Sequence, residues 1–195
     1  VLVDFSFRDL DVDSIVTNNF EASYFATKYL IDKGHRRIGF VGNIKTTKSI
    51  MDRYLGFCKA IYEHDLDLNE DYIIKERDDD KNETDYELQD DLPTAFVCNN
   101  DKAAHDLIKK LKAKGVRVPE SCSVIGFDDA AHSVFSDPKI TTIRVRKEAM
   151  AEYAVNRIIS HLGDKQLKSE KVVIDADLVE RDSVMDLHME GGGPA

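Results

Sequence analysis

The sequence predicts an α/β fold in which helices flank a parallel sheet, and two observations carry this prediction. Apolar runs at 37–42, 94–98 and 123–127 are continuous rather than alternating, which is typical of strands buried on both faces. Stretches with helical apolar spacing separate these runs, as in sheets joined by right-handed crossovers. A length of 195 residues allows one domain or two small lobes.

The first half of the chain predicts strand and helix in alternation. Residues 1–5 predict a strand, and residues 19–33 predict a helix that ends at Gly34. The run at 37–42 predicts a buried strand. The next helix has an apolar face made of Ile50, Tyr54, Phe57, Cys58 and Ile61.

The second half continues the alternation. Strands are predicted at 72–74, 94–98 and 123–127, with a helix at 101–114 that ends at Gly115. After Pro138 we expect a strand at 140–145, a helix at 148–162, and short strands at 172–174 and 178–179.

The acidic segment 76–91 predicts a solvated loop with room for one short helix. Its three consecutive aspartates, 78–80, lack the glycine and terminal glutamate of a calcium-binding loop. We therefore predict no metal site there.

Charge and cysteine content exclude several classes of function. With 27 basic and 37 acidic side chains the net charge is −10, which repels DNA, so any DNA contact needs another segment. Cys58, Cys98 and Cys122 show no disulfide or zinc pattern and fit a reducing cytoplasm. No apolar run suits a membrane span. The start without methionine suggests part of a longer protein, with residues 185–195 as a tail.

Catalysis finds little support in the sequence. None of the six histidines has a serine, cysteine or carboxylate partner at a motif spacing, and no phosphate-binding glycine loop is present. We predict no enzyme activity, no cofactor and no metal. An enzyme acting on sugars would need Asp101 or Asp128 as a general base.

Polar residues that follow three predicted strands are the candidate binding residues, because ligands of parallel α/β sheets bind at the carboxyl ends of strands. An arginine, amides and carboxylates suit the hydroxyls of a sugar, each of which donates and accepts hydrogen bonds. A nucleobase fits if Phe127 or Phe135 offers a ring face. The candidates are Asn43, Ser49, Arg53, Asn99, Asn100, Asp101, Asp128 and Asp129.

Structural roles remain open for several of these candidates. Asn100 or Asp101 suits the N-cap of the helix that begins there, with Asp101 favoured as a cap. Arg53 suits a solvated helix position paired with Asp52. The aspartates at 128 and 129 suit a turn.

Six strings resemble the LacI/GalR family of transcription regulators, in the same order as in that family. They are LIDKGHRRIGFVG at 30–42, RYLGF at 53–57, PTAFVCNND at 93–101, VPESCSVIGFDD at 118–129, PKITTI at 138–143 and LVERDS at 178–183. The resemblance implies a periplasmic-binding-protein-like (type I) lobe. It also implies effector contacts from Arg53, Asn100 and Asp128, with Ser49 and Phe127 as second-rank candidates.

The resemblance also implies a domain organisation. Residues 1–13 would end the N-terminal subdomain, 14–145 would form the C-terminal subdomain, 146–176 would return to the first, and 177–184 would return to the second. DNA would be bound only by a helix-turn-helix headpiece outside this chain, in a cytoplasmic homodimer whose expected effector is a small molecule of the sugar class. The alternative is a periplasmic sugar-binding protein of an uptake system. The acidic segment 76–91 departs from the family, which has a more apolar helix there.

Overall fold

The computed structural model describes residues 1–7, 9–163 and 167–188. Contacts divide the chain into two units, each made of separate stretches of sequence. Unit 1 contains Val1–Asn18 and Val145–Asp177, and unit 2 contains Asn19–Arg144 and Leu178–Ala195. The first boundary thus lies after residue 18, later than the predicted residue 13.

Unit 2 is built on a six-stranded sheet in the order β4-β3-β5-β6-β7-β9. The strand pairs β4-β3, β3-β5, β5-β6 and β6-β7 are all parallel. The predicted α/β class is therefore confirmed. The strands are β3 (Ile38–Val41), β4 (Ile73–Ile74), β5 (Ala95–Cys98), β6 (Ser123–Phe127), β7 (Thr141–Arg144) and β9 (Asp177–Val179).

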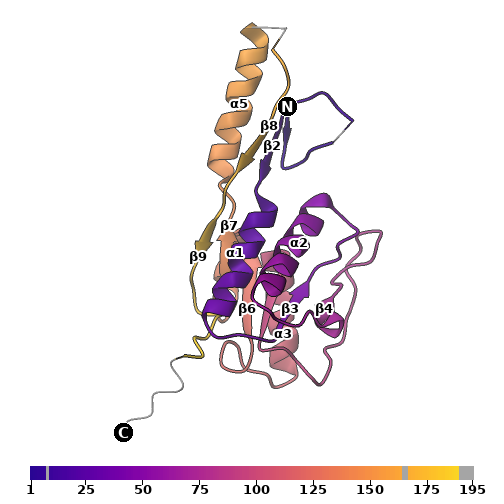
Figure 1. Ribbon diagram of the computed structural model, residues 1–195, viewed down its shortest axis with the longest axis vertical. Coiled ribbons are helices and arrows are strands. Elements are labelled where there is room, and N and C mark those ends of the chain that lie inside the picture. The colour runs from indigo at the N-terminus through magenta and orange to yellow at the C-terminus, as the bar shows by residue number, and fades with distance from the viewer. Residues whose placement is uncertain (8, 164–166, 189–195) are drawn as a thin grey trace. The chain divides into compact units, whose positions relative to one another are not determined.

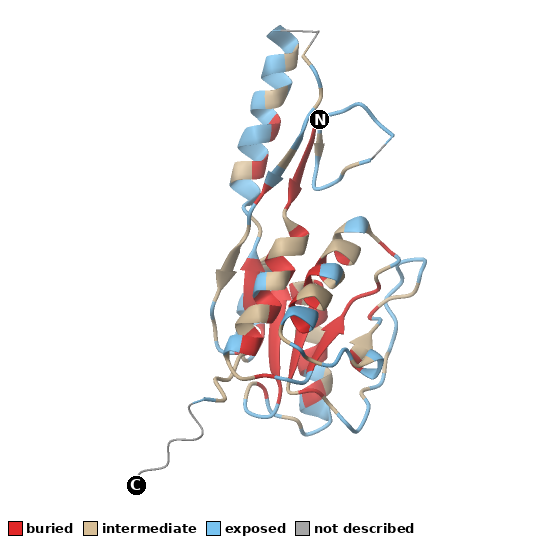
Figure 2. Cartoon of the chain, viewed as in Figure 1, coloured by how far each residue is buried: buried red, intermediate tan, exposed pale blue. Residues whose placement is uncertain are grey.

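Helices cover both faces of this sheet. In Figure 1, α1 (Asn19–Asp32) and α2 (Lys48–Glu63) lie in front, and α3 (Asp101–Ala113) lies behind. A short helix, α4 (Ala131–Phe135), was not predicted. The central strands are almost wholly buried, as Figure 2 shows, which explains why their sequences are continuous apolar runs.

The crossover from β4 to β5 contains no helix, so the short helix allowed for in segment 76–91 is absent. A 3-10 turn at Glu70–Tyr72 precedes β4, and the crossover then runs as an irregular loop. Tyr86, Leu88 and Leu92 of this loop pack against the core beside α3. Three spaced apolar side chains of this loop thus cover part of the core in the absence of a helix there.

Unit 1 has a three-stranded parallel sheet in the order β1-β2-β8, together with α5 (Lys147–Gly163). The strands are β1 (Leu2–Val3), β2 (Ser14–Thr17) and β8 (Lys171–Ile174). The central strand β2 was not predicted. It belongs to unit 1 because it pairs with β1 on one side and β8 on the other.

Asp13, just before β2, anchors unit 1 through charged contacts. Its side chain is buried and accepts hydrogen bonds from Arg157, from the Glu170 backbone and from His161. Burial alone would raise the pKa of Asp13, but these hydrogen bonds outweigh it and lower the pKa to about 2.

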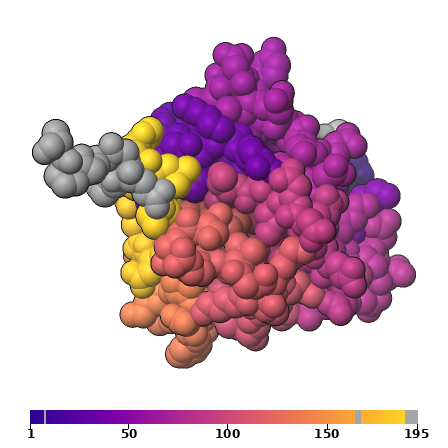
Figure 3. All heavy atoms as spheres, turned by 90° about the horizontal axis from the view of Figure 1, so that it is seen from below, coloured from indigo at the N-terminus to yellow at the C-terminus, as the bar shows by residue number. Residues whose placement is uncertain are grey.

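The end of the described chain lies against α1. Lys33 forms an ion pair with Asp186 at 3.0 Å, and the His35 ring contacts the carbonyl of Met185. Figure 3 shows the end of the described chain in yellow beside α1 in indigo. Residues 185–188, predicted as the start of a tail, are therefore packed against the chain, and residues 189–195 lie outside the described residues.

Candidate functional site

The loops that follow three neighbouring strands meet at one edge of the unit 2 sheet. Val41 of β3 lies beside Cys98 of β5, and Val97 of β5 lies beside Ile125 of β6, all in parallel register. The carboxyl ends of these strands therefore face the same way, where ligands of parallel sheets bind.

Arg53 of α2 is the centre of this edge. It is only 7% exposed, and its Nε donates to Oδ1 of Asn19 at 2.7 Å. Nη1 donates to the backbone carbonyl of Asn99, and Nη2 lies 3.4 Å from Oδ1 of Asp128. The guanidinium is thus fixed by groups from α1 and from the loops after β5 and β6.

The alternative role for Arg53, a solvated residue paired with Asp52, is wrong. Asp52 forms its ion pair with Lys48 instead, one helical turn earlier. The Arg53 guanidinium lies over the ring of Phe127, 3.6 Å from its centroid. A buried arginine stacked on an aromatic ring is more rigid than a surface arginine.

Phe127 and Ser49, the second-rank candidates, differ in accessibility. Phe127 is 1% exposed, and Arg53 covers one face of its ring. Ser49 is partly exposed in the first turn of α2, where its Oγ lies 3.0 Å from Oγ1 of Thr47. Thr47 caps this helix by accepting from the Ile50 backbone N–H.

Asn100 is the N-cap of α3. Its Oδ1 accepts from the Ala103 backbone N–H at 2.8 Å, while its Nδ2 donates to Oδ1 of Asn99 at 2.8 Å. The capping role left open by the sequence is therefore present. Both polar atoms of the Asn100 amide are engaged within the protein.

Asp101 does not cap α3, contrary to the expectation. It is the first helical residue and is 1% exposed, and its carboxylate accepts from the Ala130 backbone N–H at 2.6 Å and from Oγ1 of Thr142 at 2.5 Å. Gly126 packs directly against this carboxylate, where a Cβ would overlap it. Burial raises the pKa of Asp101 to about 6, and the two hydrogen bonds oppose the rise only in part.

Asp128 and Asp129 form a turn with unusual backbone geometry. Both have positive φ, 100° for Asp128 and 49° for Asp129, which non-glycine residues adopt rarely. The Asp128 side chain is 35% exposed and faces Arg53. The turn expected from the sequence is therefore present, and it carries a partly accessible carboxylate.

Glu76 is a residue of this edge that the sequence analysis missed. Its buried carboxylate accepts from the Asn43 backbone N–H at 2.9 Å, from Nδ2 of Asn99 at 2.8 Å and from Nε of Arg77 at 2.6 Å. Glu76 comes soon after β4, so the strand-end rule that selected Asn43 would also have selected it. Its position at the start of the acidic segment 76–91 predicted a solvent-exposed side chain instead.

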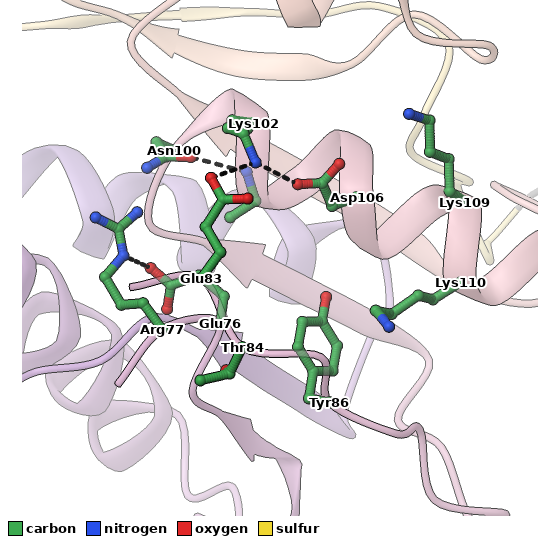
Figure 4. Close-up of a pocket in the computed structure, with 11 residues that line it drawn as sticks. Glu76, Arg77, Glu83, Thr84, Tyr86, Asn100, Lys102, Asp106, Lys109 and Lys110 are labelled. Carbon is green, nitrogen blue, oxygen red and sulfur yellow. Dashed lines mark hydrogen bonds and ion pairs between the residues drawn. The ribbon is translucent and has the colours of Figure 1, made fainter. Parts of the chain in front are cut away.

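A pocket of about 240 Å³ lies between α3 and the segment 76–86. Figure 4 shows Lys102 between Glu83 and Asp106, with which it forms ion pairs at 2.7 and 2.9 Å. Among the five predicted effector contacts, only Asn100 lines this pocket. The pocket therefore shares Glu76 and Asn100 with this edge, but Arg53 and Asp128 do not line it.

The cysteines have the core environment expected of them. All three are free, Cys98 and Cys122 are buried, and Cys58 is half-buried. Burial raises the pKa of Cys122 to about 12, so this thiol is unreactive at neutral pH. Within the described ranges, no group of three potential ligands is arranged to hold a metal ion, and no helix is long and apolar enough to cross a membrane.

Comparison with known sequences gives a family match over most of the chain. Residues 27–184 match the family described as periplasmic binding protein-like domain. The HTH-type transcriptional repressor PurR of Histophilus somni strain 129Pt is 38% identical over 197 residues. This alignment covers 96% of the chain and 57% of the repressor, so the chain spans a little over half the length of this relative.

Solved structures agree with this match. The Escherichia coli transcriptional repressor ascG is 26% identical with a TM-score of 0.77, covering 94% of this chain and 68% of that one. A LacI family transcriptional regulator from Enterococcus faecium, solved with bound ribose, has a TM-score of 0.80 and covers 95% of this chain and 70% of that one. Its identity is 22%, so it supports the fold alone.

The structure and these comparisons confirm the resemblance that the six sequence strings suggested. The chain belongs to the family of periplasmic binding protein-like domains, in the form found in LacI-type transcription regulators.

Proposed function

We propose that this chain is the larger part of the effector-binding region of a LacI-type regulator, and that Arg53 and Asp128 contact the effector. The observation that carries the proposal is the Arg53 guanidinium, buried, stacked on Phe127 and directed at the partly exposed Asp128. A fixed arginine beside an accessible carboxylate provides donors and acceptors with little ordering cost on binding.

The proposed effector is a small neutral sugar. Arg53 donates, Asp128 accepts, and a sugar hydroxyl does both. The Enterococcus faecium regulator, which shares the fold, was solved with bound ribose, so D-ribose is the first sugar to test. A nucleobase is less favoured because Phe127 is buried beneath Arg53 and offers no free ring face, although Phe135 is 81% exposed.

In the intact regulator, effector binding would shift the equilibrium between two arrangements of a cytoplasmic homodimer. This shift would change the affinity of the dimer for DNA. A headpiece outside this chain would bind the DNA, since the chain itself carries a net charge of −10. The effector must bind the two arrangements with different affinity, and such coupling is typically about 1–3 kcal/mol.

The alternatives have less support. The curated relatives are named repressors, which favours the regulator over a periplasmic sugar-binding protein. A sugar-acting enzyme would need Asp101 or Asp128 as a general base. Asp101 is buried and accepts hydrogen bonds from Thr142 and Ala130, and the Asp128 carboxylate faces the positively charged Arg53 guanidinium. We therefore propose that the protein has no catalytic activity.

A thermal-shift screen of the chain against D-ribose, other neutral sugars, sugar phosphates and purines tests the proposal. A ligand that binds only the folded state at about 100 times its Kd adds roughly 2.7 kcal/mol of stability and raises Tm. We expect a neutral sugar to raise Tm in the wild type and in Arg117→Lys, a control at an exposed arginine.

The same sugar should lose its effect in Arg53→Lys, because an ammonium replaces the planar guanidinium and its several donors. Asp128→Asn should weaken the shift by removing the charged acceptor. A shift that stays at the wild-type value in both variants contradicts the assignment of this site.

A further inference from the structure

The turn that carries Asp128 needs support from its surroundings. Two successive aspartates with positive φ are strained, and strained residues persist only where neighbouring groups hold them. The Asp128 backbone N–H donates to the Ile143 carbonyl at 2.8 Å, which secures one side of the turn. The Asp128 side chain contacts Arg53 at a long 3.4 Å.

Asp129 supports the turn through its own side chain. Its carboxylate, 13% exposed, accepts from Nη2 of Arg181 at 2.6 Å, from Nε of Arg144 at 2.7 Å and from Oγ of Ser133 at 3.2 Å. Burial alone would raise the pKa of Asp129, but hydrogen bonds from Arg144 and Arg181 outweigh it, so the carboxylate stays charged. Asp129 thus ties the turn to two arginines and to α4.

The two arginines occupy particular places in the chain. Arg144 is the last residue of unit 2 before the chain passes into unit 1, and Arg181 follows closely after the chain re-enters unit 2 at Leu178. Arg181 is fixed in turn, because its Nη1 donates to the Ile140 carbonyl at 2.8 Å. Asp129 therefore links the turn to two of the three places where the chain passes from one unit to the other.

We propose that Asp129 is a positioning residue, whose contacts with Arg144 and Arg181 hold Asp128 in place and couple the ligand contact to two of the three segments that connect the units. The proposal rests on the proposed function, in which Asp128 binds the effector. Arg181 is the stronger partner because its side chain is 16% exposed, whereas that of Arg144 is 53% exposed and more screened by solvent.

Amide hydrogen exchange in the ligand-free chain tests the positioning role directly. Asp129→Asn keeps the size of the side chain and its tolerance of positive φ but removes the charge that the arginines bind. We expect exchange at the Asp128 and Ala130 amides to become about tenfold faster, because local opening becomes easier. The Val97 amide in β5 should not change.

An NMR measurement and a control variant distinguish a positioning role of Asp129 from a general contribution to stability. The Nε–H resonance of Arg53 should shift in Asp129→Asn, since its neighbour Asp128 moves. Asp90→Asn is the matched control, because Asp90 is fully exposed and pairs with Lys114 away from this edge. Unchanged exchange at Asp128, or equal acceleration at Val97, would overturn the proposal.

Titration with D-ribose then tests the coupling to ligand binding. We expect Asp129→Asn to raise the Kd at least tenfold, with Asp90→Asn at the wild-type value. If ribose binds and its Kd is unchanged while the turn loosens, the positioning proposal is wrong. If ribose fails to bind the wild type, the sugar assignment fails, and the exchange experiment alone decides the role of Asp129.

Discussion

Replacing Glu76 with glutamine removes a buried negative charge that joins three chain segments at the carboxyl edge of the sheet. Three donors approach its carboxylate, from the Asn43 backbone, the Asn99 side chain and the Arg77 side chain. Glutamine offers one acceptor oxygen, so its amide nitrogen must face at least one donor.

The expected loss of stability follows from these contacts. A hydrogen bond to a charged group contributes about 1.5–3 kcal/mol, and leaving a buried donor unsatisfied costs about 1–3 kcal/mol. Asn43 and Asn99 are both buried, so solvent does not replace the lost acceptor. We expect Glu76→Gln to destabilise unit 2 by about 2–4 kcal/mol.

Native-state amide exchange at Val97, a buried residue of β5, measures this change in unit 2. Glu83→Gln is the control, because Glu83 lies in the same segment, is 69% exposed and pairs with Lys102. Its effect should stay below about 1 kcal/mol. Equal effects of the two substitutions would show that the Glu76 network contributes nothing beyond a surface charge.

Three further predictions concern packing and pH. Gly56→Ala should cost about 1–3 kcal/mol in urea unfolding, because the new Cβ would overlap the Phe20 carbonyl where α1 and α2 pack. Gly163→Ala, whose new Cβ meets no atom of the described residues within 4 Å, should be nearly neutral. The Asp101 pKa of about 6 in the folded state lies above its value in the unfolded state, so the folded protein binds this proton more tightly. Stability should therefore fall as pH rises from about 4 to 6. Asp101→Asn should remove this slope from a plot of Tm against pH. The Asp13 pKa of about 2 in the folded state lies below its value in the unfolded state. The stabilisation of unit 1 by Asp13 should therefore be complete above pH 4 and be lost as pH falls towards 2. Amide-exchange protection of β2 that does not change between pH 4 and pH 2 would contradict this.

The strand β2 shows where local sequence patterns stop being informative. Only Ile15 and Val16 are apolar in this four-residue strand, which is too short a run to predict. It is buried because β8 pairs beside it, with Ser14 opposite Lys171. That partner lies far away in sequence, so no local window contains the signal.

The candidate site shows the same limit at the level of single side chains. The strand-end rule selected Arg53 and Asp128, and the structure brings them together although they lie 75 positions apart. The sequence did not distinguish Asn100 as the cap from Asp101 as a buried carboxylate, because both residues suit a helix start. Burial of Asp101 depends on Thr142, which the fold brings from another strand.

The sequence by itself determined the α/β class, the order of most elements and the family, because apolar periodicity and short motifs are local properties of the chain. Only the tertiary structure decided that Arg53 is buried on Phe127, that Glu76 is an internal carboxylate, and that Asp129 joins two connecting segments. The environment of a charged group depends on which distant segments surround it, and that arrangement arises only when the sheet assembles.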